Sequence, residues 1–145
     1  MGFVVNNANQ IKMNDRFNNL TFREQKMIEE SWAKPFSEKI FPFIREERFA
    51  ELYSDNGASR PNTPVNVTVG SLMLKEILGL SDDEMVTGIV FDIRFQFALH
   101  TTSYEEQPLS DRTFSRFRRR LYDYEIRTGI DLIKEYQKLK AENMQ

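Results

Sequence analysis

The chain has 145 residues, the size of one domain, and it contains no cysteine, which excludes a disulfide scaffold and a thiolate metal site. Its hydrophobic content of 40% is sufficient for one packed core, and no apolar run approaches the roughly 18–20 residues that a membrane span needs. The net charge of −2 excludes the overall basic field that is typical of nucleic-acid-binding chains. We therefore expect one soluble domain without a membrane partner.

The charge is unevenly distributed along the chain. Residues 1–109 carry 11 Lys and Arg against 16 Asp and Glu, whereas residues 110–145 carry 9 against 6. A local basic element on an acidic body is therefore compatible with the composition.

The N-terminal part is predicted to be an arm followed by a helix. Residues 1–20 contain six asparagines without a clear period and are expected to be irregular. A helix should begin at Thr21, which forms a capping box with Glu24, and it should end at Pro35. Four apolar side chains could share one broad face of this helix: Phe22, Met27, Ile28 and Trp32.

One or two short helices, interrupted near Pro42, are predicted to follow and to extend to residue 54. Their inward side chains would be Ile40, Phe43, Ile44, Phe49 and Leu52. Residues 55–64 are dense in Gly, Pro, Asn and Ser and predict a loop. The predicted organisation is therefore an arm (1–20) and a single helical domain (21–145), divided into N-terminal helices (21–54), a loop (55–64) and a core with a DNA-binding part (65–145).

Residues 65–78 are apolar on almost every side, which places them at the centre of a helical bundle. A buried strand is the competing interpretation, but the length and the Leu, Met, Lys and Glu content favour a helix that ends at Gly79. A second helix is predicted for residues 81–100, opened by a Ser81–Glu84 capping box. Its inward side chains would be Met85, Val86, Ile89, Val90, Ile93 and Phe97.

Two further helices complete the prediction. Ser110 should cap an arginine-rich helix that runs to about Tyr124, and the last segment should form an amphipathic helix. The last helix would align Leu132, Tyr136 and Leu139. The predicted fold class is all-α, a compact bundle of about five to seven helices with a helix-turn-helix-like C-terminal part.

The segment LSDRTFSRFRRRL, residues 109–121, carries five arginines. At about 100° per residue, Phe114, Phe117 and Leu121 fall on one stripe, which should face the core. The opposite side presents Arg112, Ser115, Arg116 and Arg119, with Arg118 and Arg120 on the two flanks and Thr113 toward the Arg120 flank.

This outward side has few acids, and it places like charges one turn apart, at Arg112–Arg116 and Arg116–Arg120. Arginine is suited to bidentate contacts with phosphate and with guanine edges, so contact with nucleic acid is one interpretation. Two others stay open: the arginines are simply solvated or pair with acids of the same chain, such as Asp82, Asp83 and Glu84, or they contact another protein.

No catalytic, metal or cofactor site is predicted. The single histidine, His100, has no second histidine to share a metal, and a packing role at a helix end is expected instead. Acids at 82–84 suit the first turn of a helix without any cation. Phe91, Phe95 and Phe97 are interpreted as core or partner surface. The aromatics of the N-terminal helices could complete the core or form a dimer contact: Trp32, Phe36, Phe41 and Phe43.

Four segments in order carry a resemblance that covers more than half of the chain, from about Phe49 to Leu132. They are FAELYSDNGASRPNTPV, LMLKEILGLSDDEMV, DIRFQFAL and PLSDRTFSRFRRRL. In this order, they resemble the N-terminal domain of bacterial insertion-sequence DDE transposases, the InsH-like class.

The resemblance implies a helix-turn-helix-like domain that recognises the terminal inverted repeats of a mobile element in double-stranded DNA, in the bacterial cytoplasm at the nucleoid. In that family a separate RNase H-like domain cleaves DNA with two Asp and a Glu. Because this chain ends at Gln145 and shows no strand pattern for such carboxylates, we expect it to bind DNA without catalysis, cofactor or small-molecule substrate. A homodimer would suit the recognition of the two paired ends of such an element. The expected DNA-binding residues are Arg112, Thr113, Ser115, Arg116, Arg118, Arg119 and Arg120. The alternative function is a protein-interaction module whose arginine helix pairs with acidic groups.

Overall fold

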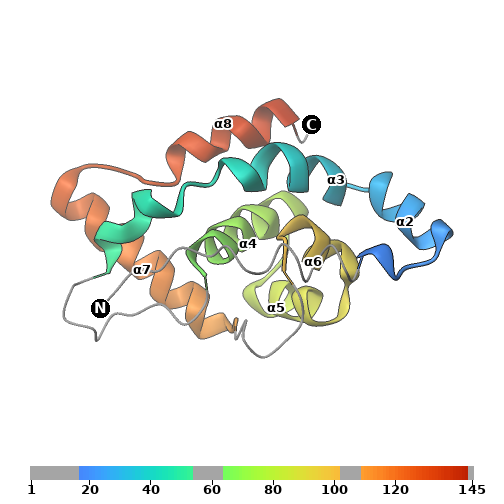
Figure 1. Ribbon diagram of the computed structural model, residues 1–145. Coiled ribbons are helices and arrows are strands. Elements are labelled where there is room, and N and C mark those ends of the chain that lie inside the picture. The colour runs from blue at the N-terminus through green and yellow to red at the C-terminus, as the bar shows by residue number, and fades with distance from the viewer. Residues whose placement is uncertain (1–16, 54–63, 102–108, 144–145) are drawn as a thin grey trace.

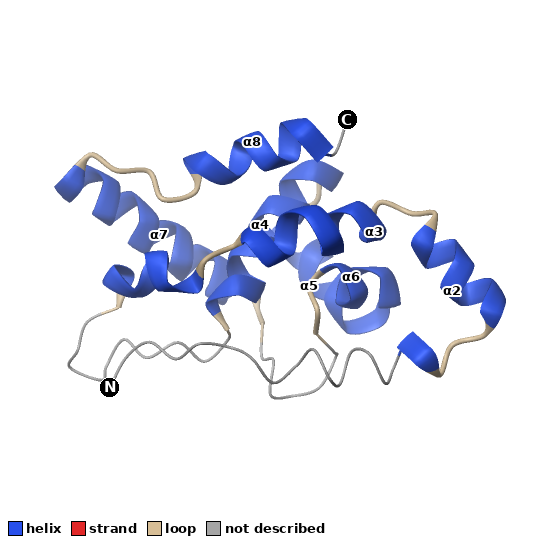
Figure 2. Cartoon of the chain, turned by 45° about the horizontal axis from the view of Figure 1, so that its top comes forward, coloured by secondary structure: helices blue, strands red, loops and turns tan. Residues whose placement is uncertain are grey.

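The computed structural model describes residues 17–53, 64–101 and 109–143, and every regular element in these ranges is helical (Figure 2). The predicted all-α class is therefore confirmed. The predicted arm, 1–20, and the predicted loop, 55–64, lie almost wholly outside the described residues, as does most of the connection at 101–108.

Helix α2 (Phe22–Glu29) begins as predicted. The Thr21 N–H donates to the Glu24 carboxylate at 2.9 Å, and the Glu24 N–H donates to the Thr21 hydroxyl at 3.1 Å. The predicted end at Pro35 is wrong, because α2 ends at Glu29 and Pro35 belongs to the next helix, α3 (Ala33–Pro35). A proline is tolerated in the first turn of a helix, where its missing N–H has no intrahelical acceptor.

The predicted inward face of α2 is only partly correct. Ile28 is buried, but Phe22 is 82% and Met27 61% exposed. Helix α2 lies at one end of the molecule and packs against α3, so only one of its sides is covered (Figure 1). The periodicity of the sequence correctly predicted an amphipathic helix. It did not indicate how little of the apolar face would be covered by the rest of the protein.

Helix α3 continues into a π-helical turn, η1 (Phe36–Ile40), and two 3₁₀ segments, η2 (Phe41–Phe43) and η3 (Glu46–Leu52). The π turn contains an extra residue, with the Phe41 N–H bonded to the Phe36 carbonyl, and this shifts the inward face. Phe41 is therefore buried, whereas Phe43, predicted to point inward, is 58% exposed. The other predicted inward residues are buried: Ile40, Ile44, Phe49 and Leu52.

Helix α4 (Val65–Leu78) lies in the middle of the molecule (Figure 1), as its apolar composition predicted. Its buried apolar side chains are Val65, Val67, Val69, Met73 and Leu74. Gly79 ends it with φ +69°, also as predicted. A Cβ at Gly70 would lie only 2.9 Å from the Leu99 side chain, so the missing side chain permits close packing there.

The single helix predicted for residues 81–100 is wrong, because the chain forms α5 (Asp82–Phe91) and α6 (Ile93–Ala98), separated at Asp92. The Asp92 carboxylate accepts the Arg94 N–H and caps α6. The buried Gln96 amide donates to the Ile89 carbonyl at 2.7 Å and so satisfies the end of α5. The break turns Val90 outward, to 44% exposure, although the helical period predicted it to be buried.

Helix α7 (Asp111–Thr128) extends four residues beyond the predicted end and stops at Gly129, with φ +77°. Helix α8 (Lys134–Asn143) then returns along η1 (Figure 1). Leu132 and Tyr136 are buried as predicted. The side chain of Leu139 lies outside the described part of the structure.

Candidate nucleic-acid interface

The predicted cap at the start of α7 is confirmed. The Thr113 N–H donates to the Ser110 hydroxyl at 3.3 Å, and the Ser110 N–H donates to the Thr113 hydroxyl at 3.2 Å. Thr113 is therefore half-buried and occupied in capping rather than free on the surface. The cap determines where the arginine-rich turns begin.

The inward stripe of α7 is also confirmed. Phe114, Phe117 and Tyr124 are all less than 10% exposed, and Leu121 packs beside them. The Phe117 ring lies 6.0 Å from the Phe49 ring of η3, and the Tyr124 hydroxyl donates to the Glu51 carboxylate of the same segment. These contacts determine the rotation of α7 about its own axis.

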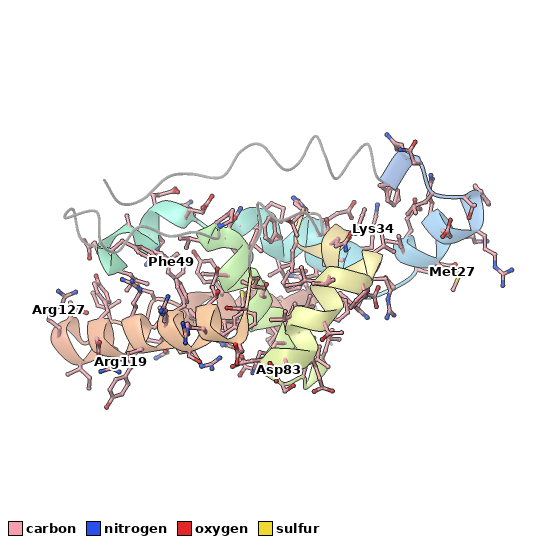
Figure 3. The ribbon with its side chains drawn as sticks, turned by 90° about the horizontal axis from the view of Figure 1, so that it is seen from below. Met27, Lys34, Phe49, Asp83, Arg119 and Arg127 are labelled. Atoms are coloured by element: carbon pink, nitrogen blue, oxygen red, sulfur yellow. The ribbon has the colours of Figure 1, made fainter. Side chains whose placement is uncertain are left out.

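The opposite side of α7 presents the basic surface, which we define as Arg112, Ser115, Arg116 and Arg119. All four side chains are exposed. Figure 3 shows Arg119 on the side of α7 that faces away from Phe49. Within the described residues, no carboxylate forms an ion pair with the three guanidinium groups of this surface. The Ser115 hydroxyl donates to the Asp111 carbonyl at 3.1 Å and keeps its lone pairs for a further donor.

Arg118, on one flank of α7, is bound to the body of the protein. Its guanidinium donates to both carboxylate oxygens of Asp82, at 3.0 and 2.7 Å, and Lys75 lies 3.5 Å from the same carboxylate. The Arg118 guanidinium holds the pKa of Asp82 below its usual value. This bidentate pair connects α7 to the first turn of α5, so the interpretation of internal pairing with the acids at 82–84 is correct for this one arginine.

Arg120, on the other flank, also contacts the body. Its guanidinium donates to the Leu52 carbonyl at 3.0 Å and lies 4.6 Å above the Tyr53 ring. The expected DNA contacts of Arg118 and Arg120 therefore remain predictions for two groups that already have intramolecular partners. Their present contacts hold α7 against α5 and η3.

Helix α5 packs against α7, whereas in a helix-turn-helix motif the supporting helix directly precedes the recognition helix. Helix α6 precedes α7 in the chain but is separated from it by residues 99–110, which is longer than a tight turn. The helix-turn-helix interpretation therefore remains a prediction.

Sequence reasoning missed one feature of α7. Beyond Arg119, exposed apolar side chains appear on the outward side beside Asp123, with Tyr122 64% and Ile126 69% exposed, and Ile130, just after the end of the helix, is 47% exposed. The signal was present in the sequence, because these apolar residues do not fit the stripe of Phe114 and Phe117. We define them as the apolar end of α7.

The remaining candidates behave as structural residues. The Nε2 atom of His100 lies 2.7 Å from the Ser37 hydroxyl, and its ring is tilted against the Phe41 ring at a centroid distance of 4.6 Å, which confirms a packing role at a helix end. Burial lowers the pKa of His100. Phe95 is buried, Phe97 is partly buried, and Phe91 is 82% exposed.

Within the described ranges, no cluster of three or more His, Cys, Asp or Glu could hold a metal ion. No helix in the same ranges is long and apolar enough to cross a membrane.

Residues 22–120 match the family model described as Transposase domain (DUF772). A search of curated proteins and a search of solved structures found no significant match. The matched region includes the complete basic surface of α7 and ends before Tyr122. The match covers more than half of the chain and agrees with the resemblance inferred from its four segments, so this chain belongs to the DUF772 family of transposase domains.

Proposed function

We propose that this chain is the DNA-binding part of a transposase, which recognises the terminal inverted repeats of a mobile element in the bacterial nucleoid. The observation that carries the proposal is the basic surface of α7. It presents three guanidinium groups, from Arg112, Arg116 and Arg119, without an acidic partner among the described residues. Membership of a transposase family supports a role with DNA.

The dimensions of the basic surface suit a major groove. From Arg112 to Arg119, the helix rises about 10 Å, at about 1.5 Å per residue. This is the length of about three base pairs at roughly 3.4 Å each. The groove admits an α-helix, and arginine binds guanine O6 and N7 in bidentate fashion. The N-terminal half of α7 also carries the positive end of the helix dipole.

The flanking contacts would orient this surface. Arg118 binds Asp82 of α5, and Arg120 binds the Leu52 carbonyl of η3. Both contacts are made from the sides of α7 and leave its outward face open. In this proposal, Thr113 secures the start of the helix, and Ser115 accepts a hydrogen bond from a base.

The proposal assigns no catalytic step to this chain. In the family that the sequence resembles, strand cleavage belongs to carboxylates of an RNase H-like domain. The residues described here support binding and orientation of a duplex.

The alternative function is a protein-interaction module in which the arginines pair with acidic groups. One observation favours it, the Arg118–Asp82 pair. That pair is intramolecular, however, and the three arginines of the basic surface do not share it.

A salt titration tests the proposal. Fluorescence anisotropy would measure binding to a short duplex carrying the ends of the element that encodes the chain, and to a shuffled duplex of equal length. For wild type, log K should fall with log salt, with a slope of about −0.9 for each phosphate contact. The variant Arg116→Ala should lose about 1–3 kcal/mol on the element end and less on the shuffled duplex if Arg116 binds a base.

The matched control is Arg23→Ala, an exposed arginine of α2. It should bind both duplexes as wild type does. Equal losses for Arg23→Ala and Arg116→Ala would show that α7 is not the interface, and the proposal would then be wrong.

A further inference from the structure

The apolar end of α7 is exposed. Tyr122, Ile126 and Ile130 are 64%, 69% and 47% exposed, although the other large apolar side chains of α7 are buried or half-buried. Large apolar side chains that gather on an exposed surface mark contact sites. The surface lies at the end of the molecule opposite α2 (Figure 1).

The apolar end lies on the same outward side of α7 as the basic surface. Ile126 is seven residues after Arg119, almost two full turns, so both project in nearly the same direction. Tyr122 is one turn before Ile126. The two residues form a short ridge that can lie against another helix.

Two opposite charges lie on one flank of this ridge, with Asp123 next to it and Arg127 further round the helix, toward Tyr124. Asp123 and Arg127 are both exposed and one turn apart. The Arg127 guanidinium lies 5.3 Å from the centre of the Tyr124 ring. A two-fold axis perpendicular to two antiparallel helices brings the same flank of each helix to the same side of the contact. The acid of one copy can therefore pair with the base of the other.

We propose that the apolar end of α7 binds the apolar end of α7 in a second copy of this chain, with the two helices antiparallel. Suppose that the axis crosses α7 between the levels of residues 124 and 126. Asp123 of one copy and Arg127 of the other then differ in height along the helix by at most two residues, or about 3 Å. The same operation pairs Arg127 with Asp123 of the other copy. Both ion pairs then lie on the same flank of the contact, beside the point where the ridges of Tyr122 and Ile126 cross.

This contact leaves Arg112 and Arg116 open. The overlap covers the last turns of α7, and Arg119 lies between about one and five residues beyond the end of the other copy's helix for axes in that interval. A contact between the last turns of two helices buries less surface than the roughly 800 Å² per partner of a standard stable interface. We therefore expect association to be weak and dependent on concentration. The proposal does not rest on DNA binding.

Sedimentation equilibrium without DNA tests the proposal. The wild-type mass should rise from one copy toward two with increasing concentration. The variant Ile126→Arg should raise the dissociation constant by about tenfold or more, because it places charge at the centre of the contact. The matched control is Phe22→Arg, another exposed apolar residue, which should associate as wild type does. Circular dichroism would verify that each variant is folded.

A charge exchange gives the sharper test. Asp123→Arg and Arg127→Asp should each weaken self-association, whereas an equal mixture of the two variants should associate at least as well as wild type. In the mixture, both ion pairs between the copies have opposite charges again.

Failure of the mixture to recover association would overturn the proposed pairing. A wild type that stays a single copy at every concentration would also overturn it. If Ile126→Arg then lowered affinity for a duplex, the apolar end would be assigned to the DNA interface instead.

Discussion

Helices α5 and α6 pack so closely at Gly88 that adding one methyl group should destabilise the protein. A Cβ at this position would lie 2.4, 2.6 and 2.8 Å from three ring carbons of Phe95, whereas carbon atoms pack at about 3.5–4.0 Å. The ring would therefore have to move by about 1 Å. It is only 7% exposed, and its neighbour Trp32 meets it at a centroid distance of 5.2 Å, so little room is left.

Overpacking of this kind costs about 1–3 kcal/mol. Replacing glycine with alanine inside a helix by itself stabilises the folded state by about 0.8–1.0 kcal/mol. The expected net loss for Gly88→Ala is therefore about 1 kcal/mol in the free energy of unfolding, measured by urea denaturation with circular dichroism, or about 3–4 °C in Tm.

A second background isolates the steric cause. In a Phe95→Leu variant, the smaller side chain leaves space for the new methyl group, so Gly88→Ala should there be neutral or stabilising. Thr87→Ala, at the exposed neighbouring position, serves as the control in both backgrounds. If Gly88→Ala proved as stable as the wild type in the original background, the inferred steric conflict would be wrong.

Three further predictions concern the support of α7 and the buried histidine. Phe117→Ala should lower the free energy of unfolding by about 3–5 kcal/mol in urea denaturation, because a ring that is only 3% exposed is removed; a loss below about 1 kcal/mol would contradict its burial. A double-mutant cycle with Asp82→Asn and Arg118→Gln should give a coupling of about 1 kcal/mol or less that decreases with salt, as expected for a partly exposed pair; a coupling unaffected by salt would refute this. Burial lowers the pKa of His100 from its ordinary 6.5, so at mildly acidic pH the unfolded chain binds a proton that the folded chain does not bind. The free energy of unfolding should therefore fall as the pH decreases from about 7 to 5. His100→Gln should flatten that dependence, and an unchanged slope in this variant would assign it to other groups.

The helix starts could be predicted because capping is local. Thr21 and Ser81 each exchange hydrogen bonds with a glutamate three residues later, and Ser110 does so with Thr113. Such pairs are visible in the sequence without any knowledge of the fold. The same holds for Gly79, whose left-handed backbone ends α4.

The break at Asp92 could not be read from periodicity. The apolar residues continue at helical spacing through this point, and the helix is divided by contacts that form only when α6 turns back on α5. Gln96 then bonds the Ile89 carbonyl, and Phe95 packs over Gly88. A similar limit explains Phe43, because the π turn at Phe36–Ile40 changes which side of the following segment faces the core.

The sequence by itself determined the all-α class, the starts of the capped helices and the outward direction of Arg112, Arg116 and Arg119. Each of these follows from the 3.6-residue period and from interactions within a few residues. Only the tertiary structure decided which arginines are engaged. Arg118 finds Asp82 at a separation of 36 residues, and Arg120 finds the Leu52 carbonyl at a separation of 68. A hydrogen bond needs its partner within about 3 Å, and for residues so far apart in the chain that proximity depends on how the helices pack.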